Sequence, residues 1–187
     1  SFSGVQAALT YSTSEANSTF GTTSGNVTWS GGPIWLGLGY EVHKFHDSNN
    51  DESDIRLAGK FDITNEIYVG ALYDTMSNVD GVDNIDGKAW AVLAGFKMAN
   101  NLFKFQYSKA DTPDTTTDLG ATLWAIGVDH NFSKTTKVYL DYAKADNDNL
   151  QSVNVSSSYA GHGTSSVPAV ADGKSPSAIS LGMIINF

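Results

Sequence analysis

The sequence predicts an all-β protein whose strands cross a membrane as an antiparallel up-and-down β-barrel. Three observations support this fold class. Apolar and polar residues alternate along many short segments, and the connections between these segments are alternately short and long. No window approaches the ~20 consecutive apolar residues that a membrane helix needs. Because a bilayer core offers backbone groups no water to bond with, any membrane span of this chain must be made of paired strands.

About ten strands follow from the alternation when the segments are taken in order along the chain. The predicted ranges are 3–12, 24–30, 33–44, 54–63, 67–75, 88–98, 102–109, 119–132, 136–145 and 177–187. The tight connections, rich in hairpin residues, are 31–33, 64–66, 99–101 and 133–135. The other connections are long and polar, and the longest is an outer loop near 146–176. Residues 1–187 are therefore predicted to form a single barrel segment, with turns at one end and loops at the other.

Each predicted strand has an apolar face and a polar face, because side chains alternate along a strand. Apolar columns such as Ile34, Leu36, Leu38 and Tyr40 mostly end in an aromatic residue, as a girdle at lipid headgroups requires. The opposite face is predicted to line a pore through Arg56, Lys60, Lys97, Lys104, Lys137, Glu41, Asp74, Asp129 and Asp141. Two interpretations stay open. The cations form an arc that attracts anions, or the charges pair across neighbouring strands and only solvate the inner wall.

A β-sandwich would show the same alternation, with the apolar residues buried in a shared core. The barrel is favoured because charged residues recur opposite an unbroken apolar column in strand after strand. Detergent dependence of the purified protein would separate the two architectures.

The composition argues against several classes of function. The net charge of -9 disfavours nucleic-acid binding, which needs clustered Lys and Arg. The lack of Cys disfavours a disulfide scaffold and a thiolate metal site. Most acidic residues fall in segments that resemble loops, among them Asp47, Asp51, Glu52, Asp54, Asp80, Asp83, Asp86, Asp111, Asp114, Asp118, Asp146 and Asp148.

No metal, cofactor or catalytic residue is predicted. Asp47, Asn49 and Asp51 have the spacing of the first EF-hand ligands, but Glu52 stands where that loop needs Gly and Ala58 where it needs Glu. A solvated acidic loop is the favoured interpretation, with Ca²⁺ or Mg²⁺ binding as the alternative. The His residues lack ligand spacing, and the sequence contains no Gly-x-Ser-x-Gly nucleophile motif.

The last predicted strand carries Ser180, Gly182, Ile185 and Phe187. This pattern resembles the C-terminal insertion signal of bacterial outer-membrane β-barrels, and it implies the barrel-assembly machinery as a partner. The odd-numbered residues of this strand are predicted to face lipid and the even-numbered residues to face inward, with Ile184 as the awkward apolar member of the inward set.

Two segments resemble Gram-negative general porins. Residues 125–147 resemble the penultimate hairpin of that family, with Phe132-Ser-Lys-Thr-Thr136 at the turn and Tyr139 and Tyr142 on the next strand. Thr135 replaces the usual Arg of the family, and His130 replaces a common Tyr. The opening residues 1–11 resemble the strand that follows the middle of the family's barrel.

The resemblance implies the C-terminal part of a sixteen-stranded porin in the outer membrane. It implies a homotrimer in contact with outer-membrane lipid and lipopolysaccharide, and passive diffusion of ions and small hydrophilic solutes with no reaction. An open sheet in lipid would leave rows of unpaired backbone groups, so either further strands complete the barrel or these strands close on themselves. The alternatives are a compact ten-stranded outer-membrane hydrolase or adhesin, and a secreted β-sandwich lectin.

Overall fold

The computed structural model describes residues 3–12, 19–45, 50–111, 118–155 and 169–186. They form one ten-stranded antiparallel sheet in which each strand pairs with the next along the chain. The strands are β1 Val5–Ser12, β2 Thr19–Gly31, β3 Ile34–Phe45, β4 Glu52–Asp62, β5 Ile67–Ser77, β6 Gly87–Met98, β7 Asn101–Asp111, β8 Ala121–Asn131, β9 Thr136–Asn147 and β10 Ser177–Ile185. The up-and-down antiparallel fold is therefore confirmed.

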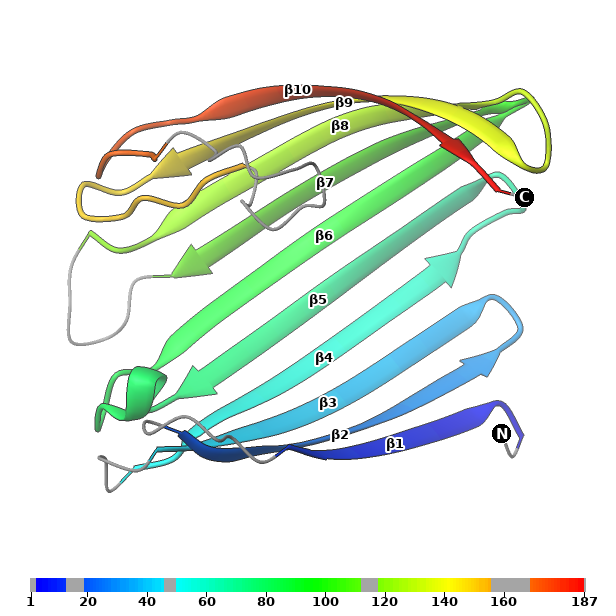
Figure 1. Ribbon diagram of the computed structural model, residues 1–187. Helices are drawn as coiled ribbons and strands as arrows, with labels where there is room; N and C mark the ends of the chain where they lie inside the picture. The colour runs from blue at the N-terminus through cyan, green and yellow to red at the C-terminus, as the bar shows by residue number, and fades with distance from the viewer. Residues whose placement is uncertain (1–2, 13–18, 46–49, 112–117, 156–168, 187) are drawn as a thin grey trace.

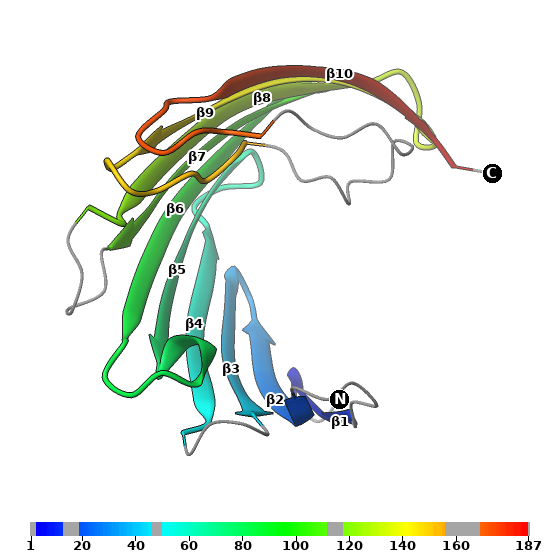
Figure 2. The ribbon, with the colours of Figure 1, turned by 60° about the vertical axis from the view of Figure 1, so that its left-hand side comes forward.

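The sheet is curved into an open trough (Figure 2), with short turns at one end of the strands and long connections at the other (Figure 1). β1 begins and β10 ends at the turn end. Within the described residues these two strands pair only with β2 and β9, so the sheet does not close on itself.

Two of the short turns are organised by a hydroxyl group. In the β4–β5 turn, Thr64 Oγ1 accepts hydrogen bonds from the backbone N–H groups of Glu66 and Ile67, both at 3.1 Å. In the β8–β9 turn, Ser133 Oγ accepts from the N–H groups of Thr135 and Thr136 at 3.1 and 3.0 Å. Such turns are favoured by Ser and Thr because the side chain satisfies backbone donors that the sheet cannot reach.

Several predicted boundaries were wrong by a few residues. Ser3 and Gly4 form a turn at positive φ (48° and 81°), so the first strand begins only at Val5. A 3-10 helix, η1, covers Val79–Gly81 in the β5–β6 connection and was not predicted. The last strand ends at Ile185, and Phe187 lies outside the described residues.

Four of the acidic residues assigned to loops lie in strands: Glu52 and Asp54 in β4, Asp111 in β7 and Asp146 in β9. The error has a common cause. Acidic residues are rare in the middle of strands, so their presence suggested loops, whereas these strands extend beyond the apolar band into polar surroundings.

The sheet has an apolar face, and the described residues place no protein layer against it. One row of apolar residues crosses six neighbouring strands in register: Leu181, Leu140, Val128, Phe103, Phe96 and Ile67. In the described residues only Ala121 and Ala145 are buried apolar residues, whereas Leu181 is 78% exposed. A sandwich would bury this face, so the β-sandwich alternative is not supported, and lipid is the medium that suits the exposed apolar rows.

Among the described residues, no helix is long and apolar enough to cross a membrane.

Candidate functional site: the polar face of the sheet

The strand register brings all the predicted pore-lining residues to one face of the sheet. Arg56 lies directly opposite Asp74, and Lys104 and Asp141 both lie opposite Gly127. By the same register and alternation this face carries Arg56, Lys60, Lys97, Lys104, Lys137, Glu41, Asp74, Asp129 and Asp141.

Exposure indicates that the polar face is the concave one. Asp74 and Asp129 are only 7% and 5% exposed although the described residues form no second layer over them. Side chains converge on the inside of a curved sheet and diverge on the outside, so the crowded polar face is concave and the splayed apolar face is convex.

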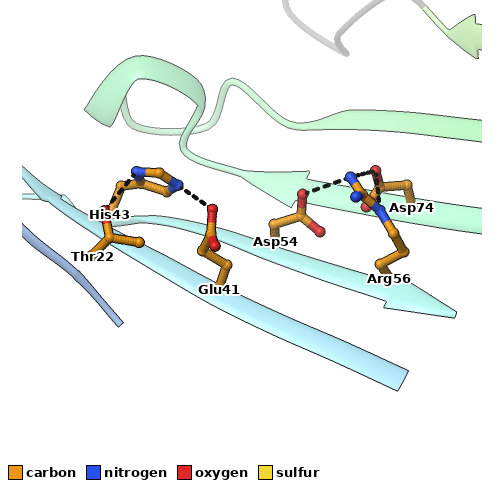
Figure 3. A network of polar contacts seen from close by, with 6 residues as sticks. All are labelled: Thr22, Glu41, His43, Asp54, Arg56 and Asp74. Atoms are coloured by element: carbon orange, nitrogen blue, oxygen red, sulfur yellow. Dashed lines mark hydrogen bonds and ion pairs between the residues drawn. The ribbon is translucent and has the colours of Figure 1, made fainter. Parts of the chain in front are cut away.

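One polar network lies near the loop end of β2 to β5 (Figure 3). The Arg56 guanidinium donates to Asp74 Oδ2 through Nε at 3.1 Å and through Nη2 at 2.6 Å, and Nη2 lies 3.5 Å from Asp54 Oδ2. On the neighbouring strands, His43 Nε2 lies 2.6 Å from Glu41 Oε1, and His43 Nδ1 lies 3.3 Å from Thr22 Oγ1. Asp74 is thus held by a charge-assisted pair of bonds from the adjacent strand.

A second network lies across β7, β8 and β9. Lys104 Nζ is 2.6 Å from Asp129 and 3.1 Å from Asp141, and Lys137 Nζ is 2.9 Å from Asp129. Two lysines and two carboxylates therefore alternate across three strands. Their charges largely cancel locally, and the Asp129 carboxylate at the centre is the most enclosed member.

The balance of charge changes along the strands. Lys60, Lys97, Lys104 and Lys137 lie within four residues of a short turn, where Asp62 and Asp129 offset them in part. The half of the strands that leads to the long loops carries Glu41, Glu52, Asp54 and Asp74, with Arg56 as the one cation beside them on β3 to β5. The concave face is therefore more basic toward the turns and more acidic toward the loops. Such an axial separation of charge acts on any ion that moves along this wall.

Near the turns the cations differ in their partners. Lys60 Nζ is 2.7 Å from Asp62 and lies 5.2 Å from the centre of the Tyr68 ring. Lys97 has no ion pair within the part of the chain that the structure describes. The pairing across neighbouring strands that the second interpretation anticipated is thus present for Arg56, Lys104 and Lys137, whereas Lys60 pairs within its own strand.

Sequence reasoning missed some members of this face. Asp54 and Asp62 share the alternation of Arg56 and Lys60 but were not assigned to the pore wall, and the aromatic rings of Trp35, Tyr68 and Tyr139 also lie on the polar face. The alternation alone could have found all of them, since each is an even number of residues from an assigned neighbour on the same strand.

The residues of the predicted insertion signal take the predicted faces where the structure describes them. Ser180 lies opposite Asp141 and Gly182 opposite Tyr139 on the polar face, while Ile185 continues the apolar face. The Tyr139 ring lies over Gly182 so closely that a Cβ at that position would collide with it. Only a residue without a Cβ therefore fits at position 182 beneath the Tyr139 ring.

No group of three His, Asp or Glu side chains in the described residues is arranged to hold a metal ion. The loop that begins at Asp47 falls partly outside the described residues.

Comparisons with known proteins agree with this geometry. The family model described as Gram-negative porin matches residues 1–150. An anion-selective porin from Comamonas acidovorans superposes with a TM-score of 0.81 at 21% identity, over 100% of this chain and 57% of that one. The outer-membrane expressed OmpT of Vibrio cholerae gives a TM-score of 0.64 at 19% identity, over 78% of this chain and 52% of that one. A NanC porin gives 0.58 at 12% identity, over 100% of this chain and 96% of that one.

A search among curated proteins found no significant match. The chain spans 57% of the length of the Comamonas porin. Three observations lead to one conclusion: the family model matches most of the chain, the ten strands are antiparallel, and the apolar face is exposed. The chain belongs to the Gram-negative porin family, and its location is the outer membrane.

Proposed function

We propose that the protein forms a water-filled channel for passive diffusion of ions and small hydrophilic solutes. One observation carries the proposal: the concave face is lined with ionisable side chains while the convex face is apolar and exposed. Since a charged wall needs water and an apolar wall needs lipid, this arrangement suits a barrel that encloses an aqueous path. No reaction is part of the proposed function.

The wall described by the ten strands is proposed to be part of a sixteen-stranded barrel, with the long connection between β9 and β10 on the outer side. Its unpaired edges support this, because an open edge in lipid leaves backbone N–H and C=O groups without partners. We further propose a homotrimer, contact with outer-membrane lipid and lipopolysaccharide, and insertion by the barrel-assembly machinery through Ser180, Gly182, Ile185 and Phe187.

The test is conductance of the purified protein in a planar bilayer. We expect stepwise current increments that scale with salt concentration. Two neighbouring substitutions on β8 provide a matched comparison, since Ala125 lies on the concave face and Ile126 on the convex face. Ala125→Trp should narrow the path and reduce the conductance of each step, whereas Ile126→Trp should leave it unchanged.

A folded, inserted protein that passes no current would contradict the channel and favour the plugged barrel of a hydrolase or adhesin. Equal effects of the two tryptophans would contradict the assignment of the concave face to the pore.

A further inference from the structure

The concave wall contains a hollow beside the network of Lys104 and its carboxylate partners. Its volume is about 350 Å³, which is within the range of sites for small molecules. Side chains on five neighbouring strands, β5 to β9, line it: Tyr68, Leu93, Lys104, Gln106, Ala125 and Asp141. An aromatic ring and two aliphatic side chains therefore face the same space as an amide, a cation and a carboxylate.

The large side chains around the hollow lie over glycines of neighbouring strands. A Cβ at Gly95 would collide with the Tyr68 ring, so this ring lies over β6. A Cβ at Gly127 would collide with the Asp141 carboxylate and would lie 3.1 Å from Lys104 Cε, so both of these side chains lie over β8. The part of the wall between the two covered glycines forms the floor of the hollow.

One side of the hollow is apolar. The register sets Leu93 opposite Gln106, and Gln106 opposite Ala125 on the next strand. Leu93 is 38% exposed although it lies on the face that carries the ionisable side chains. Contact with an apolar group would remove this surface from water, and the Tyr68 ring offers further apolar area. This side therefore suits the apolar part of a ligand.

The opposite side of the hollow carries charges that balance. The Lys104 ammonium group lies 2.6 Å from Asp129 and 3.1 Å from Asp141, and the Lys137 ammonium group lies 2.9 Å from Asp129. Two ammonium groups and two carboxylates give this cluster no net charge. Lys104 and Asp141 are the members that line the hollow, and their side chains are 34% and 36% exposed.

The Gln106 side chain adds a polar group to the same space. It is exposed, and its amide forms no hydrogen bond with another residue in the described part of the chain. Gln106 is two residues from Lys104 on the same face of β7. Since an amide N–H and an ammonium group both donate hydrogen bonds, the two side chains together suit a carboxylate of a ligand.

From this arrangement we propose that the hollow binds zwitterionic amino acids with apolar side chains. The α-carboxylate accepts hydrogen bonds from Lys104 and Gln106, and the α-ammonium group donates to Asp141. The apolar side chain lies against Leu93 and Tyr68. The inference rests on the proposed channel and deepens it, because it names a class of solute that the wall retains during passage.

Charge balance favours a zwitterion over an ion of either sign. A lone anion at Lys104 weakens the only ion pair of Asp141 among the described residues, and a lone cation at Asp141 draws this carboxylate from Lys104. A zwitterion compensates both groups, because its two charges replace the 3.1 Å contact between them. The nearby Lys60 is neutralised by Asp62 at 2.7 Å and adds no net charge.

The experiment measures binding of L-leucine to the purified, folded protein in detergent by ligand-observed NMR titration. Three analogues each lack one part of the proposed ligand. The compound 4-methylpentanoate lacks the ammonium group, 3-methylbutylamine lacks the carboxylate, and glycine lacks the apolar side chain. Each should bind roughly tenfold more weakly than leucine, or worse, since each loses a charge-assisted hydrogen bond or an apolar contact.

Two variants each remove one contact. Asp141→Asn should weaken leucine binding by roughly tenfold, to the level of 4-methylpentanoate, because the ammonium group loses its acceptor. Leu93→Ala should reduce leucine binding to the level of glycine. Leu72→Ala is the matched control and should leave binding unchanged, since Leu72 lies on the concave face of β5 outside the hollow. Lys97→Gln changes the charge of the same wall outside the hollow and should also leave leucine binding unchanged.

Equal binding of leucine and 4-methylpentanoate to the unmodified protein would overturn the proposal, by reducing the hollow to a site for anions. An equal loss of binding in Leu72→Ala and Leu93→Ala would overturn it as well. Conductance in a planar bilayer is measured in parallel. A protein that conducts salt but does not bind leucine contradicts only this inference, whereas a folded protein that binds leucine but passes no current contradicts the channel.

Discussion

At the scale of single residues, the concave face is organised by shared carboxylates. The Asp129 carboxylate accepts hydrogen bonds from two lysines on two different strands, and the Asp74 carboxylate accepts two hydrogen bonds from Arg56. Each of these Asp residues is nearly enclosed, so its cation supplies hydrogen bonds that water can supply only in part. The basic residues of this wall therefore stabilise neighbouring strands as well as contributing to the field along the wall.

Arg56→Gln should have two separable effects. The Asp74 carboxylate loses its charged donor, and we expect a loss of about 1–3 kcal/mol in the free energy of unfolding, measured by urea titration. The carboxylates of Asp54 and Asp74 are then uncompensated, so the reversal potential in a salt-gradient bilayer should shift toward cations.

Lys97→Gln serves as the matched variant, because Lys97 has no ion pair among the described residues. It should shift the reversal potential without lowering stability. In the double variant Arg56→Gln with Asp74→Asn, part of the lost stability should return. If the double variant lost the sum of the two single effects, Arg56 and Asp74 would not be coupled.

At the scale of the strands, glycines and aromatic rings fit together across neighbouring strands of the concave face. The Tyr139 ring covers Gly182 on the adjacent strand, and the Tyr68 ring covers Gly95 in the same way. An aromatic ring that lies across a glycine replaces contacts that the missing side chain cannot make. In both pairs the ring occupies the space that a side chain at the glycine would need.

Gly182→Ala should destabilise the barrel by about 1–3 kcal/mol, because the added Cβ forces the Tyr139 ring from its place. Tyr139→Ala combined with Gly182→Ala should cost less than the sum of the single changes. The stability of the single and double variants is measured by unfolding in urea, with the folded fraction determined from the heat-dependent electrophoretic mobility. Strict additivity would show that the ring and the glycine do not interact in the membrane.

The two faces of β10 give a second test at this scale. Leu181 lies opposite Leu140 on the convex face, and Ser180 lies opposite Asp141 on the concave face. Leu181→Lys should cost about 2–4 kcal/mol of stability, the range for a cation near the middle of the lipid face. Ser180→Lys places the same charge beside a carboxylate and water, and it should change the stability little. Equal costs would reject the assignment of the faces.

At the scale of the whole molecule, the convex face is not uniform. On β1 to β3 a groove lies over Ala7, Gly25 and Val27, beside Leu9 and Leu38. Small residues at such a place let a second wall approach closely. This groove is a candidate for the contact between the subunits of the proposed trimer.

Gly25→Trp should fill that groove and weaken the trimer, so that the mass in mild detergent falls toward that of one barrel. Ile126→Trp, on the convex face of β8, is the control and should leave the mass unchanged. A wild-type protein that already has the mass of one barrel would contradict the trimer, and an unaffected trimer in the Gly25 variant would place the contact elsewhere.

The sequence alone was sufficient for the number of strands, their order and their two faces. It was sufficient because alternation with a period of two is a local property: Ile179, Leu181 and Met183 share a face whatever lies beside them. Strand ends were less certain, since Glu52, Asp111 and Asp146 extend their strands past the apolar band, where local composition resembles a loop.

Only the tertiary structure decided which residues on a face meet. The pairing of Arg56 with Asp74, of Lys104 with Asp129 and of Tyr139 with Gly182 depends on strand register and curvature, which bring together residues far apart in the chain. Register also revealed that Leu93, Gln106 and Ala125 line one hollow, because it sets these residues of three strands side by side. A pattern within one strand carries no information on its neighbours, so these contacts could be found only after the strands were set side by side.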